Sequence, residues 1–559
     1  MGSRHLTPDW VRMSSTPSLP GEKNHRQAHA RRESLHARGA ALHETAGRQF
    51  RRSVDVRSRP LLAGLTGLAL VALSACGSTV PHAGGLAGRS GTINDLPSLT
   101  GEGGPAVAPT AGSAPIASGP TLSHGGSSPS GLGPSGASVG PVSSAGVYDA
   151  IPPIGQGWDR KYVYVGVSTL KDGNTYVKAL GFAVDTGDEE GDAKAILAAL
   201  NKQGGLFGRQ LKAVVHDTHL ADLAADPGTA GQSACTAFTQ DQRVLFAVGE
   251  MDVPSYRGCM AAHHTAVLSL LHIDWDDEFA RQVAPFYYNT GFISITHLAQ
   301  EILGRLKAQN YFGGWDVANR RSSPLTPVKV GILYTNDDVG NREGPRVVAD
   351  FAKAGYPSEG FSVGQESDFA AAVLRFRADG VTHLFAPDSS IDLFVAEASS
   401  QHYYPRLALN TNNLPVGWFQ ANGFQASATG AIGLGWNPSI DVDQSHDPGM
   451  MGGQGWCLTA LKAGGQVFGS TIKRWAQATA LSYCDAIRLF VSGARASGRL
   501  DASAIRAGVV SVAANVPVAT GFGVSGISPT NFAIPGGARD LYFEDSCQCF
   551  RYRGPTYRI

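Results

Sequence analysis

The residues best able to bind a small molecule stand in polar loops, each of which follows an apolar run of the sequence. Hydroxyl side chains and the free amides of helix N-termini can hold a carboxylate, whereas a carboxylate side chain can hold an ammonium group. Aromatic side chains in these loops could stack on an apolar part of a ligand. The candidates are Ser168, Thr169, Glu250, Asp252, Ser255, Tyr256, His272, Asp274, Trp275, Asp337, Asp338, Asp388, Ser389, Thr411 and Asn412.

Strand-like and helix-like stretches alternate through residues 158–559, and they are the elements that must position these loops. Strands that alternate with helices predict parallel βαβ units, and continuous apolar strands fit a sheet covered on both faces. The rhythm occurs twice. Strands are expected over 162–167, 211–215, 244–249 and 267–273, and again over 328–334, 381–386 and 407–410. Helices are expected over 192–203, 230–238, 346–354, 369–378 and 393–399.

The fold class that follows is α/β, with two doubly wound Rossmann-like lobes. In open parallel sheets, ligands lie outside the carboxyl ends of the strands, which is where the candidate residues stand. Serine, aspartate and asparagine are also ordinary helix caps and turn formers, so each candidate could have a structural role instead of a role in ligand binding.

Two motifs typical of zinc proteases and of phosphate-binding loops are missing from residues 158–559. This stretch holds no His-Glu-x-x-His and no Gly-x-x-x-x-Gly-Lys. The acidic turns over 274–278 and 441–443 lack the glycine and glutamate of a calcium loop, and His263-His264 have no partners at zinc spacing. We therefore expect no metal and no cofactor, and a binding protein instead of an enzyme.

The net charge of the chain is zero, because 46 basic residues balance 46 acidic ones. This balance argues against an overall basic nucleic-acid binder, and the 43% of apolar residues suffices for a sizeable core. It is a cancellation, because residues 1–60 alone carry 12 basic and 5 acidic residues. The remainder is mildly acidic, which is compatible with export.

Residues 51–75 have the pattern of a secretory signal, with basic residues followed by an uncharged apolar run over 61–73. As a helix this run rises about 20 Å, which is short of a bilayer core of about 30 Å. Leu73-Ser74-Ala75-Cys76 resembles the bacterial lipobox, which implies a lipid on Cys76. Residues 1–50 show no periodic apolar pattern. We interpret them either as an unstructured leader or as the result of a translation start that was assigned too far upstream.

Residues 76–157 read as a flexible tether. Of residues 77–150, 54 of 74 are Gly, Ser, Pro, Ala or Thr, which leaves too few large apolar groups to offset the entropy of ordering. A chain of this kind would let the folded part stand about 45–50 Å from its anchor.

Three motifs, in this order, resemble type I periplasmic binding proteins, in particular the leucine/isoleucine/valine-binding branch. The first is an Asn-x-x-Gly-Gly-x-x-Gly-Arg turn over 201–209, followed by a strand and Asp217. The second is the strand over 331–334 with Asp338-Val339-Gly340 after it, and the third is Tyr483-Cys484-Asp485-Ala486.

The resemblance implies two lobes that close over a ligand across a three-segment hinge. It places the chain crossings near Tyr288, Trp436 and Gly521. Lobe one would then be 158–288 plus 437–520, and lobe two 289–436 plus 521–559.

Six cysteines remain besides Cys76, and an even number outside the cytoplasm suggests three disulfides among fifteen possible pairings. The resemblance implies the pair Cys235 and Cys259. Cys457 and Cys484 are plausible neighbours on the late helices, while a bond between Cys547 and Cys549 would close a tight ring, so this last pairing stays open.

The loops depart from the amino-acid-binding pattern of the family. Where a Ser/Thr run usually meets the ligand carboxylate, only Ser255 remains, and the next loop is bulky and acidic around Asp274 and Trp275. These departures argue against a plain branched-chain amino acid and favour a ligand with a cationic or polar group.

We therefore expect an extracytoplasmic solute-binding protein that delivers a small polar, amino-acid-like ligand to the permease subunits of an ABC importer. It would be a monomer, held on the outer face of the cytoplasmic membrane by the lipid on Cys76, with no nucleic-acid partner. The alternative is a lipoprotein that senses its ligand and signals through a membrane partner without transport.

Overall fold

The computed structural model describes residues 151–175, 185–270, 272–388, 391–419, 425–469 and 473–559. The predicted secretory signal over 51–75, Cys76 and Ser389 therefore lie outside the described residues. In the part described, no helix is both long and apolar enough to cross a bilayer. The chain packs from Ile151, which belongs to the hydrophobic core a few residues before Trp158.

A five-stranded parallel sheet with the order β2-β1-β3-β4-β5 contains the first series of strands. Strands β3 and β4 are buried at every residue, as expected of apolar runs covered on both faces. The bounds are β1 Tyr162–Leu170, β2 Gln210–Thr218, β3 Phe246–Gly249, β4 Ala266–Ser269 and β5 Tyr287–Asn289.

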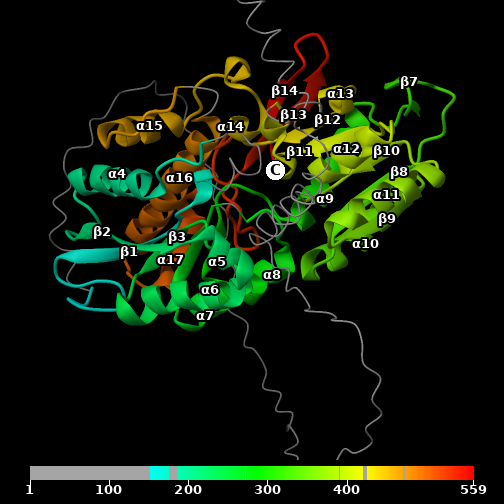
Figure 1. Ribbon diagram of the computed structural model, residues 1–559. Helices are drawn as coiled ribbons and strands as arrows, with labels where there is room; N and C mark the ends of the chain where they lie inside the picture. The colour runs from blue at the N-terminus through cyan, green and yellow to red at the C-terminus, as the bar shows by residue number, and fades with distance from the viewer. Residues whose placement is uncertain (1–150, 176–184, 271, 389–390, 420–424, 470–472) are drawn as a thin grey trace, which may run out of the picture. The chain divides into compact units, whose positions relative to one another are not determined.

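Helices cover both faces of this first sheet, with α4 and α16 on one face and α6 and α7 on the other (Figure 1). Local signals start several of them: Asp188 caps α4 through the amide of Gly191, and Asp226 caps α6, whose first residue is Pro227. The bounds are α4 Glu189–Lys202, α5 Leu220–Ala225, α6 Pro227–Thr236, α7 Pro254–Ala262, α8 Asp277–Gln282, α15 Gln454–Ala463, α16 Arg474–Ser497 and α17 Ala502–Val512.

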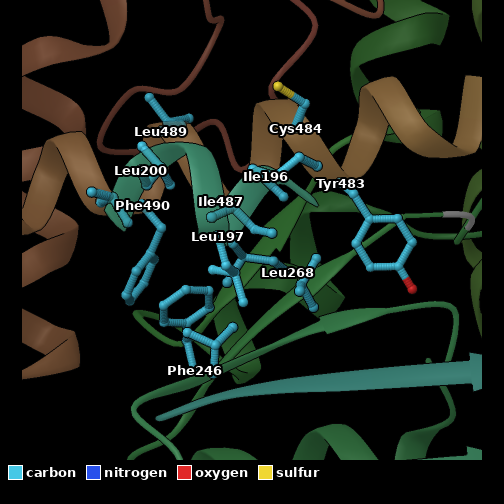
Figure 2. Close-up of a cluster of buried hydrophobic side chains, with 14 of the residues drawn as sticks. Ile196, Leu197, Leu200, Phe246, Leu268, Tyr483, Cys484, Ile487, Leu489 and Phe490 are labelled. Atoms are coloured by element: carbon cyan, nitrogen blue, oxygen red, sulfur yellow. The ribbon is translucent and has the colours of Figure 1, made fainter. Parts of the chain in front are cut away.

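The contact between α4, α16 and the sheet is a closely packed apolar cluster. Figure 2 shows Ile196, Leu197 and Leu200 of α4 and Ile487 and Phe490 of α16 gathered around Phe246 and Leu268. The rings of Phe246 and Phe490 are 4.3 Å apart. Because Ala247 lies between two residues of this cluster and packs into the core on the α6 side, the pleat divides β3 between the two faces.

The second sheet has the order β14-β13-β12-β11-β10-β8-β9, and all its strand pairs are parallel except the two that β13 forms with β12 and β14. Phe351 of α10 stacks on Phe385 at 5.7 Å, while the neighbouring Leu384 packs in the cluster of Phe376 and Phe394 from α11 and α12. The sheet is therefore also covered on both faces. The bounds are α9 Ile295–Ala308, β8 Val330–Thr335, α10 Asp338–Lys353, β9 Ser358–Val363, α11 Glu366–Ala378, β10 His383–Phe385, α12 Ile391–Ser400, β11 Arg406–Asn410, β12 Ile432–Gly435, β13 Gly537–Glu544 and β14 Cys549–Arg558.

Short elements complete the described chain. They are β6 Trp315–Asp316, β7 Arg321–Ser322, α13 Gln425–Ala428, α14 Pro438–Asp441, and the turns η3 Ala237–Asp241, η4 Thr411–Asn413, η5 Pro415–Phe419, η6 Gln444–His446 and η8 Ala513–Asn515.

The two sheets repeat one topology, because β9-β8-β10-β11-β12 follows the same order as β2-β1-β3-β4-β5. The predicted α/β class with two doubly wound parallel sheets is thereby confirmed. The predicted strands match the observed ones closely, but the strand expected over 267–273 ends at Ser269. The helix expected to begin at Arg346 begins at Asp338, where Asp337 caps it through the amide of Gly340 at 2.7 Å.

Chain segments from different parts of the sequence meet beside β5. Asn289 exchanges backbone hydrogen bonds with the segment 532–534, at 2.9 Å from its amide to Phe532 and 2.7 Å from Ile534 to its carbonyl. The indole of Trp436, directly after β12, donates to the carbonyl of Gly291 at 3.0 Å. The crossing near Gly521 stays a prediction, since Ala533 still pairs with Asn289 and β13 begins only at Gly537.

Three disulfides join Cys235 to Cys259, Cys457 to Cys484, and Cys547 to Cys549. The first links α6 to α7 and the second links α15 to α16, so each closes a loop between neighbouring helices. Both add covalent restraint to the elements that flank the first sheet.

We predict that Asp485→Asn lowers the free energy of unfolding by about 3 kcal/mol, because buried hydrogen bonds to a charged group are costly to lose. The Asp485 carboxylate, 2% exposed, accepts from the amides of Ala519 and Thr520 and from the Thr520 hydroxyl, each at 2.8 Å. Urea unfolding measures the change. The matched control is Asp501→Asn at the N-cap of α17, where asparagine caps equally well. Equal losses in the two variants would contradict the prediction.

Candidate functional site

The order of the first sheet places a topological switch point between β1 and β3. After β1 the chain leads to α4 on one face of the sheet, and after the neighbouring strand β3 it leads to α7 on the opposite face. Ligands of doubly wound sheets bind in the crevice that such a point opens at the carboxyl ends of the strands. Ser168, Thr169 and Glu250 lie at these ends, and the amide of Glu250 contacts the carbonyl of Ser168 at 3.4 Å.

Three buried carboxyl groups gather around this point, and we call Glu189, Asp192 and Glu250 the acidic cluster. Glu189 accepts the amide of Leu170 at 3.2 Å, and so stands at the end of β1. The Oε1 atom of Glu250, a residue only 5% exposed, has no hydrogen-bond partner among the described residues, and neither has either carboxylate oxygen of Asp192.

Burial governs the acidity of this cluster. It raises the pKa of Glu250 to about 7 and that of Asp192 to about 8. Burial, followed by the nearby charge of Glu250, raises the pKa of Glu189 well above its ordinary value. The N-terminus of α4 favours the ionised form of nearby carboxyl groups, but the desolvation of these groups outweighs that effect and raises their pKa values. A positively charged group beside these carboxyls would favour their ionised forms.

Tyr483 of α16 lies beside the cluster and fixes the end of β1. Its hydroxyl donates to the carbonyl of Ser168 at 3.1 Å, while the Ser168 hydroxyl accepts the amide of Met251 at 3.3 Å. The negative charges of Glu189 and Glu250, after burial, raise the pKa of the Tyr483 phenol. It therefore remains a neutral hydrogen-bond donor at physiological pH.

Asp252 forms a closed network away from the acidic cluster. It pairs with Arg257 of α7 and accepts the Tyr287 hydroxyl at 3.1 Å. The guanidinium of Arg257 in turn lies 4.1 Å from the ring centre of Phe279. Burial opposes ionisation, but the positive charges of His272 in its protonated form and of Arg257 outweigh it and hold the pKa of Asp252 below its ordinary value.

His272 completes this network as a neutral imidazole, because burial lowers its pKa to about 4. Its Nδ1 donates to the Tyr287 hydroxyl at 3.0 Å, since that hydroxyl already donates to Asp252. Asn289 fixes the loop by donating to the carbonyl of His272 at 2.7 Å. Asp252 and the Nδ1 side of His272 are thus engaged with their neighbours, whereas the Nε2 atom of His272 lacks a hydrogen-bond partner among the described residues.

The remaining candidates beside the first sheet are packed against other residues of the protein. Tyr256 and Trp275 are buried in the core, where the Trp275 ring lies 5.9 Å from that of Tyr287. Asp274 is also buried, next to Trp275. The Ser255 hydroxyl donates to the carbonyl of Gly228 at 3.0 Å.

Polar residues at the carboxyl ends of the second sheet are tied to one another. Asp388 accepts the amide of Thr335 at 2.9 Å, and Asn412 donates to the carbonyl of Pro387 at 3.0 Å. Thr411 donates to Asp441 at 2.9 Å. Among the candidates here, the oxygen of the Asn412 side chain lacks a hydrogen-bond partner within the described chain, and Asp338 is exposed beside the capping residue Asp337.

Sequence reasoning missed Glu189, Asp192 and Tyr483 as members of the site. The acidic run at 188–190 was a usable signal, because acidic residues before a helical pattern mark a helix N-terminus. Tyr483 stands in one of the motifs that carried the family resemblance, but only its position on α16 brings it to Ser168.

No protein-family model matches this chain, and none of the curated proteins does. Solved structures of type I periplasmic binding proteins and ABC transporter substrate-binding proteins match it at low sequence identity. An ABC transporter substrate-binding protein from Desulfitobacterium hafniense in complex with Leu is 16% identical, and the match covers 70% of this chain and 100% of that one with a TM-score of 0.46.

Two further matches have similar extent. The periplasmic binding protein type 1 from Bordetella pertussis Tohama I is 12% identical over 71% of this chain and 100% of its own, with a TM-score of 0.48. A solute binding protein of an ABC transporter from Rhodopseudomonas palustris HaA2, in complex with p-hydroxybenzoic acid, is 12% identical over 71% and 97%, with a TM-score of 0.49.

We predict that Glu250→Gln stabilises the protein increasingly as the pH rises. The folded-state pKa of Glu250, about 7, lies above its unfolded value, so its favourable contribution is complete below about pH 4.5 and is lost as the pH rises to about 7. The difference between variant and wild type should grow over this window to about 3 kcal/mol, at about 1.4 kcal/mol per pKa unit.

Urea unfolding at a series of pH values measures this difference. The control is Glu278→Gln, a change of an exposed carboxyl on α8. A Glu250→Gln difference that stays constant from pH 4 to pH 8 would show that Glu250 titrates normally.

Proposed function

We propose that this protein is an extracytoplasmic solute-binding protein that holds a small, amino-acid-like ligand with a cationic group and delivers it to an ABC importer. The observation that carries the proposal is the repeated strand order of the two sheets together with the acidic cluster at the first switch point. Solute binding needs no reacting groups, in keeping with the expectation that the protein is not an enzyme.

We infer a cationic ligand because burying the ionised carboxyl groups of the acidic cluster is energetically unfavourable. Glu250 and Asp192 are buried, and the Oε1 atom of Glu250 and both carboxylate oxygens of Asp192 lack hydrogen-bond partners among the described residues, which is unfavourable unless a proton or another positive charge is supplied. An ammonium or guanidinium group at the ends of β1 and β3 would supply both charge and hydrogen-bond donors. Its arrival would displace the protons that burial keeps on these carboxyls.

The rest of the ligand would meet polar groups of the second sheet. The unpartnered oxygen of Asn412 and the exposed Asp338 are the free acceptors that the candidate residues offer there. A ligand that contacts both sheets binds a closed arrangement more tightly than an open one, and this difference is what would drive closure. The buried Asp252 network would keep the intervening loop fixed.

The membrane anchor and the importer are the parts of the proposal that rest on the sequence. The lipobox-like Leu73-Ser74-Ala75-Cys76 supports lipidation of Cys76, and the motifs of the leucine/isoleucine/valine-binding branch support delivery to permease subunits. Co-purification with permease and ATPase subunits from detergent-solubilised membranes tests delivery. Recovery of a sensor kinase in their place would favour the sensing alternative.

We predict that lysine or arginine stabilises the purified protein more than leucine, isoleucine, valine or 4-hydroxybenzoate does, as measured by thermal shift and calorimetric titration. Glu250→Gln should weaken binding of the cationic ligand at least about 10-fold, because it removes the negative charge that makes the hydrogen bond to the ligand cation a strong one. Wild-type affinity should rise between pH 6 and pH 8, as Glu250 loses its proton.

The control variant is again Glu278→Gln, which should bind like the wild type. Stabilisation by leucine, isoleucine or valine above all cationic compounds would refute the cationic site while leaving solute binding intact. No stabilisation by any small solute would instead contradict the solute-binding function.

A further inference from the structure

A cluster of sulfur and nitrogen donors lies at the turn between β13 and β14. Cys547 lies in this turn and Cys549 begins β14, with one residue between them, and His446 of η6 stands 103 residues before Cys549 in the sequence. The Nε2 atom of His446 lies 3.6 Å from the Sγ atom of Cys549, and one donor atom from each of the three residues lies within 4.8 Å of the others. The cysteines form a disulfide in this structure.

Hydrogen bonds around His446 orient its free electron pair toward the sulfurs. The Ser445 hydroxyl donates to Asp443 at 2.7 Å, so it must accept from Nδ1 of His446, which lies 3.1 Å away. Nδ1 then carries the proton, and Nε2 has the lone pair that faces Cys549. Histidines that bind metals are held in just this way, with the second ring nitrogen donating to a neighbouring acceptor.

The neighbouring carboxylate is engaged elsewhere. The carboxylate of Glu544, at the end of β13, accepts hydrogen bonds from the Arg551 guanidinium at 2.6 Å and from the Ser546 hydroxyl at 3.1 Å. The donor set is therefore two sulfurs and one imidazole nitrogen. Thiolate and imidazole ligands suit Zn²⁺, and three protein ligands leave its fourth tetrahedral position to water.

The disulfide that masks these sulfurs is the most accessible of the three. Cys547 is exposed, whereas Cys259 is half-buried and Cys235, Cys457 and Cys484 are each fully buried. A dithiol in solution can therefore attack Cys547 before it reaches the other two bonds. The dithiol becomes a cyclic disulfide, and its two electrons and two protons pass to Cys547 and Cys549 as thiols.

We propose that reduction by a dithiol converts Cys547, Cys549 and His446 into a zinc site. Binding of Zn²⁺ releases the two thiol protons and forms two zinc–thiolate bonds and one zinc–imidazole bond. The site is separate from the proposed ligand site, because the turn lies near the amino end of β12, where Thr429 donates to Asp545 at 2.9 Å. It would cross-link the turn to the segment that follows α14.

The test uses the full chain, treated with a limited amount of dithiothreitol, desalted without oxygen and titrated with Co²⁺ alone. We expect one Co²⁺ per chain, an intense thiolate-to-cobalt absorption band in the near ultraviolet, and loss of that band when Zn²⁺ is added. Any Co²⁺ that the oxidised chain binds should not give the thiolate-to-cobalt band. Mass spectrometry after alkylation should find modified Cys547 and Cys549 and intact bonds at the other two pairs.

Variants assign the ligands. Cys547→Ser and Cys549→Ser should each abolish the band, His446→Gln should weaken Co²⁺ binding at least 10-fold, and Asp443→Asn should weaken it up to 10-fold through the orientation of His446. His402→Asn, at an exposed histidine, is the control and should leave binding unchanged.

The proposal is overturned if the reduced wild-type chain binds Co²⁺ without the thiolate band. It is also overturned if dithiothreitol opens another disulfide first, or if His446→Gln binds as tightly as the wild type. Because the first two observations need only the wild-type chain, a variant that fails to fold does not remove the test.

Discussion

Every strand of the first sheet runs in the same direction, and this constraint decides where the polar groups of the chain must gather. Apolar strands covered on both faces leave room for polar side chains only at their ends. The carboxyl ends of β1 and β3 meet at the switch point, so Ser168 and Glu250 become neighbours although they are far apart in sequence. The acidic cluster is the consequence of α4 entering the same edge with Glu189 in its first turn.

Two groups of buried charge at this edge are handled in different ways. Asp252 is neutralised within the fold, because Arg257 pairs with it and Tyr287 donates to it. Glu250 and Asp192 have no such partner among the described residues, and burial holds their pKa values near neutrality. A compensated carboxylate steadies a loop, whereas an uncompensated one is available to a ligand. This contrast is why the proposed site centres on Glu250 instead of Asp252.

Much of the fold could be predicted from the sequence, because strand and helix patterns are local. The start of α10 could not, since glycines and Pro345 within it resemble a loop. Those glycines serve packing: a Cβ atom on Gly344 would lie 2.4 Å from the Tyr334 ring, so only glycine lets the helix lie this close to β8. Such a requirement arises only once the helix and the strand have met.

The same limit applies to the sites. The sequence places Asp252, His272 and Glu250 at strand ends, but their roles depend on Arg257, Tyr287 and Tyr483, which tertiary packing supplies. Likewise, His446 shows no ligand spacing with Cys547 and Cys549 along the chain, and only the β13–β14 turn brings the three together.

The proposed function depends on a positively charged group bound at the acidic cluster. Native mass spectrometry of the protein, purified quickly from its own cells without added solutes, tests this most directly. We expect a bound small molecule that carries an amine or guanidine and that is lost from Glu250→Gln but retained by Glu278→Gln. A bound molecule that is anionic, or that is retained equally by both variants, would contradict it.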